Sequence, residues 1–322
     1  MGYLPRGSGF GRLVVLCATF CMASSALTAG ADAPPSSDRP AESRAGESGS
    51  LPVALRSLRD IADASGPIGD GSEFIVGRWD RFPSVLILDL RDFAAQDRMF
   101  SRLAFYLEKS GYRGRLMTDG ELEGLHGWNA HDYGPAGLAA FFTAASAKNF
   151  PLTDEELRLR DLVLEEGIIE RRGDSFSAGA GAVLSICRES DRYARRLLLA
   201  HESYHGIFFT VPAYRRLCYS LWDAAEKNER RFMLRLLTYL GYDTGSRELV
   251  VNEFQAYLLQ QPASMLEAYV RRMEPLMVKN PNVSTPPVED ALPGLIADEK
   301  KLESFLEKNF EIGAGGMYRS GR

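Results

Sequence analysis

The chain has little of three things: cysteine, net positive charge and long apolar segments. It contains four cysteines in 322 residues and has a formal net charge of −5. A net negative chain offers no basic surface for phosphate groups, so we expect no nucleic-acid partner. No internal repeat is present, and the glycines of residues 178–181 precede a predicted strand rather than follow it, which excludes a dinucleotide fingerprint. The remaining composition, 45% apolar and 25% charged, is that of an ordinary globular protein.

The one markedly apolar segment lies at the N-terminus and has the features of an export signal. Arg6 and Arg12 precede a mostly apolar stretch over residues 13–27, and Ala29-Gly30-Ala31 is a candidate cleavage site. The stretch is shorter than the roughly 20 residues that span a membrane. We therefore predict a cleaved signal peptide over residues 1–31, a periplasmic or extracellular location and no stable membrane anchor; an uncleaved anchor is the alternative.

Cleavage would leave two cysteines, Cys187 and Cys218. In an oxidising compartment they could form a disulfide. The alternative is a pair of separate buried thiols, because free cysteines commonly act as small apolar residues. The sequence leaves both possibilities open.

The N-terminal half of the mature chain predicts a small α/β layer. Residues 32–66 contain a segment rich in proline, serine and glycine, typical of a flexible tether, and then a short helix. Apolar runs at 73–77 and 84–90 predict strands, and the periodicity of 92–110 predicts a helix that Gly111 ends. These elements define a predicted subdomain over residues 67–150.

Residues 111–135 are irregular in sequence and contain two of the four histidines, His126 and His131. We expect a loop here. Functionally it could line a cleft, with His131 or Tyr133 touching the substrate; the alternative is a packed loop that contains a hydrogen-bonded histidine.

The second half, residues 151–322, is predicted to be mostly helical, which makes the whole chain α+β. Thr153 and Glu156 form a capping box at the start of one helix. A β-type run follows at 182–187. Further helices are expected at 191–209, 215–240 (as one or two), 247–261 and 296–310.

The central helix carries the motif His201-Glu202-Ser203-Tyr204-His205. Two histidines four residues apart lie on one face of a helix, where both imidazoles can bind one metal ion. Glu202 is then placed to take a proton from a metal-bound water.

A catalytic zinc site needs a third protein ligand and keeps one position for water. Glu253 lies in a strongly apolar part of the predicted helix 247–261, where a carboxylate without a cation would be costly. Glu248 is the competing ligand, and its surroundings in the sequence are less apolar. We therefore expect Zn²⁺ bound by His201, His205 and Glu253.

His201-Glu202-Ser203-Tyr204-His205 with a downstream Asn252-Glu253-Phe254-Gln255-Ala256 resembles the gluzincin branch of the zinc metallopeptidases. The resemblance covers residues 180–260. It implies a zincin-like catalytic domain over residues 151–322, with the same three zinc ligands and with Glu202 as general base. It also implies that strand 182–187 is an edge strand forming the rim of the cleft and pairing with substrate. An oxyanion-stabilising residue is expected, with Tyr242 as first candidate and Tyr257 and His131 behind it.

Together these features predict an exported zinc peptidase that acts on a peptide or protein substrate. A cell-wall peptide amidase would use the same site. The alternative is a non-catalytic exported binding or envelope-structure protein with a structural or vestigial zinc site, although such a site has no use for Glu202.

Overall fold

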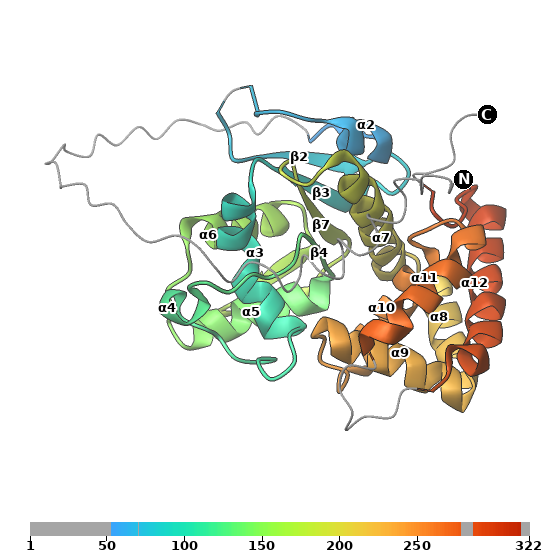
Figure 1. The fold of residues 1–322 in the computed structure, drawn as a ribbon. Helices are drawn as coiled ribbons and strands as arrows, with labels where there is room; N and C mark the ends of the chain where they lie inside the picture. The colour runs from blue at the N-terminus through green and yellow to red at the C-terminus, as the bar shows by residue number, and fades with distance from the viewer. Residues whose placement is uncertain (1–52, 70, 278–285, 317–322) are drawn as a thin grey trace, which may run out of the picture.

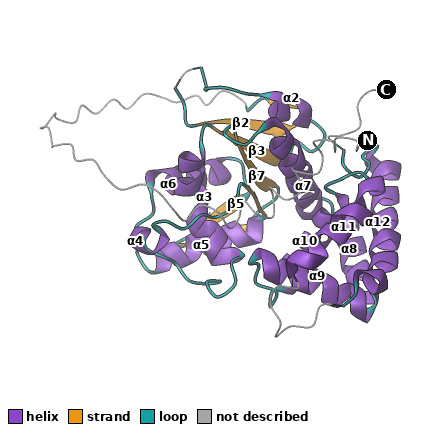
Figure 2. Cartoon of the chain, in the orientation of Figure 1, coloured by secondary structure: helices purple, strands orange, loops and turns teal. Residues whose placement is uncertain are grey.

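The computed structural model describes residues 53–69, 71–277 and 286–316 and has a mixed α+β fold (Figures 1 and 2). The predicted signal peptide and most of the predicted tether lie outside the described residues. A five-stranded sheet of order β1-β2-β3-β7-β4 forms the centre. Its strands are β1 (Leu55–Arg56), β2 (Phe74–Trp79), β3 (Val85–Leu90), β4 (Ala130–Tyr133) and β7 (Ala182–Cys187). The strand pairs β1–β2 and β3–β7 are parallel, whereas β2–β3 and β4–β7 are antiparallel. A separate hairpin joins β5 (Ile169–Arg172) to β6 (Ser175–Ala178).

Helices surround the sheet. Before β7 they are α2 (Leu58–Asp63), α3 (Phe93–Leu107), α4 (Asp119–Leu122), α5 (Pro135–Ala147) and α6 (Asp154–Glu165). After β7 they are α7 (Arg192–Thr210), α8 (Pro212–Ala224), α9 (Lys227–Leu240), α10 (Arg247–Leu259), α11 (Ala263–Met277) and α12 (Val288–Phe310). In Figure 1, α8 to α12 gather on one side of α7.

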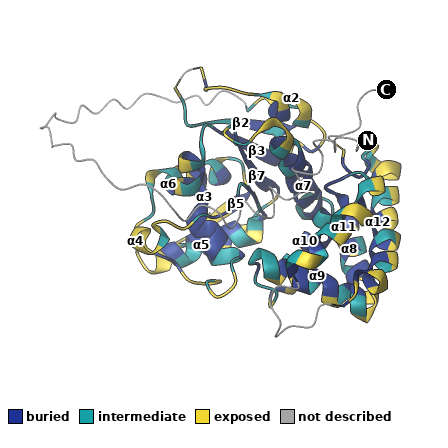
Figure 3. Ribbon diagram, viewed as in Figure 1, coloured by how far each residue is buried: buried dark blue, intermediate teal, exposed yellow. Residues whose placement is uncertain are grey.

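The central strands are buried on both faces, which explains their nearly continuous apolar sequence. Successive side chains of a strand point to opposite faces. Val85 and Ile87 of β3 accordingly join a core with α7 and the C-terminal helices. Leu86 and Leu88 join a second core with α3, α5 and α6. The sheet is thus the middle of three layers, and its central strands β3 and β7 are among the most deeply buried parts of the described chain (Figure 3).

Helix α7 is fixed against the sheet by its own sequence. Asp191 caps its N-terminus, where the carboxylate accepts hydrogen bonds from the backbone N–H groups of Tyr193 and Ala194. In the last turns, a Cβ atom on Gly206 would lie only 3.2 Å from Val85 Cγ1. The absence of a side chain at Gly206 therefore lets the helix lie close to β3, one residue after His205.

Most elements lie where the sequence predicts them. The strands at 73–77, 84–90 and 182–187 are present as β2, β3 and β7, and the capping box of Thr153 and Glu156 is confirmed. The segment 215–240 forms two helices, and Gly241 ends the second in a left-handed conformation, with φ of 96°. β4, the β5–β6 hairpin, α4 and α11 were not predicted, and β1 occupies part of the segment predicted as the first helix, which is present only as α2.

The predicted edge strand was wrong. Strand 182–187 lies between β3 and β4, with every residue buried, so it has no free edge for a substrate. The edge strand on this side is β4, which among the described residues pairs only with β7. Since β3 and β7 are neighbours, the predicted boundary between residues 150 and 151 runs through a single sheet.

The glycine-rich segment 178–181 continues from β6 and pairs with the residues that precede β5. The N–H groups of Gly179 and Ala180 donate to the carbonyls of Ile168 and Gly167. These groups are therefore used within the fold. Over the part of the chain that the structure describes, no helix combines the length and apolar character that crossing a membrane requires.

Candidate metal centre

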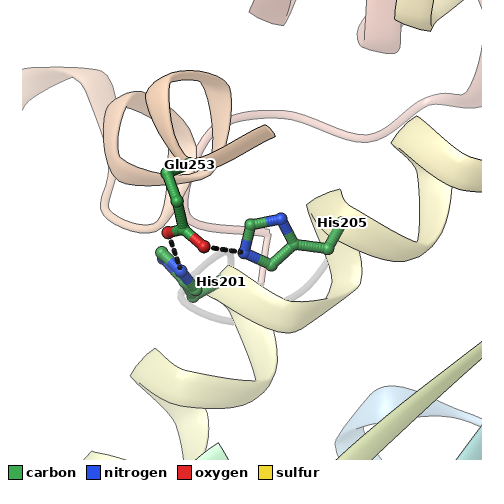
Figure 4. Close-up of side chains that lie close together, drawn as sticks. All are labelled: His201, His205 and Glu253. Atoms are coloured by element: carbon green, nitrogen blue, oxygen red, sulfur yellow. Dashed lines mark ion pairs between the residues drawn. The ribbon is translucent and has the colours of Figure 1, made fainter. Parts of the chain in front are cut away.

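The structure brings His201, His205 and Glu253 together. The two histidines lie one turn apart on α7, and Glu253 projects from α10 toward both rings (Figure 4). Nε2 of His201 is 3.4 Å from Oε2 of Glu253, and Nε2 of His205 is 3.7 Å from Oε1. All three side chains are buried.

The polar atoms of this cluster have few hydrogen bonds of their own. Both ring nitrogens of His205 and Oε2 of Glu253 are buried without a hydrogen-bond partner. Buried polar groups are normally satisfied, so such a concentration of unpaired atoms points to a missing ligand. Two imidazoles and one carboxylate are also the donor set of a catalytic zinc site. The residues present therefore fit a zinc ion.

Gln260 completes the surroundings of His201. Nδ1 of His201 lies 3.1 Å from Oε1 of Gln260. With its proton on Nδ1, the ring donates to this oxygen and presents the Nε2 lone pair toward Glu253. Such a contact fixes the tautomer and orientation of a metal-binding imidazole.

The electrostatics of the cluster also suit a cation. Burial lowers the pKa of His201 and of His205 to about 4, which keeps both rings neutral, the form that binds metals. Burial raises the pKa of Glu253 to about 8; the nearby His205 opposes this shift and Asp132 adds to it. Burial, followed by the charges of Asp132 and Glu253, holds the pKa of Glu202 well above its usual range. A divalent ion would offset the repulsion among these carboxylates.

Glu202 lies beside the cluster and does not complete it. Its side chain is buried, and Oε2 has no hydrogen-bond partner. Its carboxylate, that of Asp132 and a ring nitrogen of His205 offer ligand atoms that lie within 4.8 Å of one another. Glu202 is therefore positioned to contact a molecule held next to His205.

Asp132 of β4 is the site residue that sequence reasoning missed. Its Oδ2 lies 3.5 Å from Nε2 of His205, and its Oδ1 accepts a hydrogen bond from Nδ2 of Asn252 at 3.1 Å. Burial raises the pKa of this carboxyl to about 7. The signal that could have found it is the alternation of residues 130–133, which places His131 and Asp132 on opposite faces of a strand.

His131 faces away from the metal ligands. Its ring stacks on Phe100 of α3, with centroids 5.0 Å apart, and Nδ1 lies 3.0 Å from the hydroxyl of Tyr133. The packed reading of this segment is therefore the correct one for His131, and we drop it as an oxyanion candidate. His126 also has partners outside the cluster: its Nδ1 contacts Asp97 of α3, and its Nε2 contacts the side chain of Asn129.

The two tyrosine candidates remain near the cluster. Tyr242 is buried, stacks on Trp128 and acts on Glu253, whose pKa its hydroxyl lowers. The ring of Tyr257 lies against that of His201, with centroids 4.7 Å apart. The two hydroxyl oxygens are 3.5 Å from each other.

The other sequence candidates lie outside the cluster. Glu248 is exposed in the first turn of α10 and belongs to neither group of potential metal ligands in the described residues. Cys187 and Cys218 are both buried and free, so the alternative of separate thiols is confirmed and the disulfide is not formed.

Comparison of the chain with models of protein families, with curated proteins and with solved structures finds no match. The functional argument therefore depends on the residues of the site itself.

Proposed function

We propose that this chain is an exported zinc-dependent peptidase with a zincin-like catalytic domain. The observation that carries the proposal is the convergence of His201, His205 and Glu253, with the unpartnered carboxylate of Glu202 beside them. A bound zinc ion would polarise the substrate carbonyl and lower the pKa of a bound water to about 7. Export is inferred from the N-terminal sequence alone.

Glu202 is the general base in this proposal. Its carboxylate accepts a proton from the attacking water and passes it to the nitrogen of the leaving amine. The environment suits both steps, because a pKa raised by burial makes the carboxylate a stronger proton acceptor than an exposed glutamate. A non-catalytic zinc protein would have no use for an unpaired carboxylate at this position.

Tyr242 is the proposed donor to the developing oxyanion. It is buried next to Glu253, and burial together with the nearby carboxylate raises the pKa of its hydroxyl well above the usual range. The group therefore stays protonated and can donate a hydrogen bond to an oxygen that gains negative charge.

A peptide substrate is supported by the position of β4. This strand forms an edge of the sheet and carries Asp132 directly to the cluster. Unpaired N–H and C=O groups of an edge strand can bind an extended peptide as an added strand. The edge that substrate would use is thus β4, in place of the strand expected from the sequence.

The test is Glu202→Gln in the full chain. We expect the variant to bind zinc as the wild type does and to cleave a mixed peptide library at least ~100-fold more slowly, the usual range for loss of a general base. Cleaved peptides are identified by mass spectrometry. Full activity in Glu202→Gln would contradict the proposed role, and a wild-type protein that cleaves no peptide with zinc bound would contradict the peptidase itself.

A further inference from the structure

A small pocket adjoins the candidate metal centre. It has a volume of about 140 Å³ and lies between the end of α3, the end of β4 and the start of α10. Asp132 and Asn252 line it, and both are in contact with the cluster: Asp132 faces His205, and Asn252 precedes Glu253. Asp132 is thus shared by the pocket and the surroundings of the cluster.

The pocket is lined by the carboxylates of Glu108, Asp132 and Glu248 and by two arginines. Glu108, at the end of α3, is only 6% exposed and lines the pocket together with Asp132. Oε2 of Glu108 accepts a hydrogen bond from Nε1 of Trp128, and Oε1 has no hydrogen-bond partner within the described ranges. The pocket therefore presents an acceptor that the fold leaves unused.

The cations around the pocket do not neutralise this lining. Arg113 donates to the carbonyl of Leu107 and lies 3.8 Å from Asp243. Arg215 is exposed. Across the described part of the chain, neither arginine forms an ion pair with Glu108 or Asp132. Lys109 lies over the ring of Trp128, with Nζ 3.0 Å from its centroid.

The carboxylates around the pocket repel one another. Glu108, Asp132, Glu202 and Glu253 form a group of carboxyl groups that act electrostatically on one another. Of these, Glu108 and Asp132 line the pocket. An ammonium group in the pocket would be a donor to their oxygens.

We propose that the pocket lined by Glu108 and Asp132, here called the acidic pocket, binds an ammonium group of the substrate. This inference rests on the proposed peptidase function and names its substrate class: peptides that present a positive charge next to the bond to be cleaved. A cavity of about 150 Å³ holds a benzene molecule, so the acidic pocket has room for one side chain or one terminal residue. The ammonium can be the N-terminus of the peptide or the end of a lysine side chain.

The test measures binding, so it does not depend on turnover. The full-length Glu202→Gln variant, loaded with zinc, is titrated with penta-alanine amide that carries a free or an acetylated N-terminus. A second set of acetylated peptides carries lysine or norleucine at each of the five positions in turn. We expect roughly tenfold or tighter binding of the charged member of one set, the usual effect of a charge-assisted hydrogen bond.

The role of Glu108 in binding the ammonium group is tested by adding Glu108→Gln to the Glu202→Gln variant. Glutamine keeps an acceptor for Trp128 and removes the charge. We expect the preference for the charged peptide to fall about tenfold, while Glu165→Gln, an exposed carboxylate on α6, leaves it unchanged. Thermal unfolding verifies that each variant is folded. The comparison of charged with neutral peptides needs no pocket variant, so it stands even if Glu108→Gln does not fold.

The outcomes separate this inference from the proposed function. Equal or undetectable binding of charged and neutral peptides, or tighter binding of a succinylated N-terminus, would overturn the acidic pocket whether or not the wild type cleaves peptides. A preference for the free N-terminus would make the protein an aminopeptidase-like binder. A preference for lysine at one position would make it selective for a basic side chain. Loss of zinc binding or of cleavage would instead count against the proposed function.

Discussion

Replacing Glu253 by glutamine should have opposite effects on stability with and without zinc. Without metal, the carboxylate is 1% exposed and Oε2 has no hydrogen-bond partner. Burial raises its pKa from 4.5 to about 8. A folded pKa above the unfolded value means that the metal-free fold loses stability as pH rises from about 4.5 to about 8. The loss is on the order of 4 kcal/mol once the group is charged.

Glutamine keeps the shape of the side chain and removes this loss. In the presence of a chelator at pH 8.5, Glu253→Gln should therefore unfold about 5–10 °C above the wild type, at a few degrees per kcal/mol for a chain of this size. At pH 4.5 the two proteins should unfold at similar temperatures. With zinc at about a thousand times its dissociation constant, the wild type gains about 4 kcal/mol. The variant, which lacks the third ligand, should gain far less.

The assay is differential scanning calorimetry of both proteins with chelator and with zinc. Glu248→Gln, an exposed carboxylate on the same helix, is the matched control and should respond to zinc as the wild type does. If Glu253→Gln were stabilised by zinc as strongly as the wild type, Glu253 would not be a ligand. If it were no more stable than the wild type with chelator at pH 8.5, the argument from its buried charge would be refuted.

Three further substitutions test other parts of the account. His131→Ala should lower the free energy of unfolding by about 2 kcal/mol through loss of its stacking on Phe100; calorimetric zinc titration should show unchanged affinity, because the side chain lies on the other face of the sheet. Gly181→Ala should cost about 2–3 kcal/mol in urea unfolding, since φ is +125° and a Cβ would lie 2.5 Å from the carbonyl oxygen of Ser84. A gain or no change would refute that reasoning. Burial and the charge of Glu303 raise the pKa of Glu299 to about 7, so stability falls as pH rises from about 4.5 to 7. Glu299→Gln should then stabilise the protein by on the order of 1–2 kcal/mol at pH 8 and leave it unchanged at pH 4.5, whereas a pH-independent effect would exclude this cause.

The parts of the fold that the sequence predicts are those with a strong local signal. The periodicity of α7, its Asp191 cap and the capping box of α6 depend on neighbours a few residues apart. The mostly apolar strand 182–187 can likewise be predicted from its own residues. Its position in the sheet is not, because pairing with β3 joins residues almost a hundred positions apart. A strand that helices cover on both faces has the same apolar sequence pattern at any position in the sheet, so the pattern does not reveal which strands are its neighbours.

The site shows the same division. His201, Glu202 and His205 share one turn of helix, so their spacing alone places them together. Glu253 could be proposed because a carboxylate in an apolar helix needs a partner. Asp132 was missed, since β4 is only four residues long and so short an alternation of apolar and polar residues resembles a loop. Only its antiparallel pairing with β7 turns Asp132 toward α7 and His131 toward α3.

The most direct test of the central claim is a crystal structure of the full chain soaked with zinc, with anomalous diffraction measured at the zinc edge. We expect one ion bound by Nε2 of His201, Nε2 of His205 and the carboxylate of Glu253, at about 2.0–2.2 Å. We also expect a water on the open side, within hydrogen-bond distance of Glu202. An ion bound elsewhere, or no ion at this cluster under saturating zinc, would contradict the account.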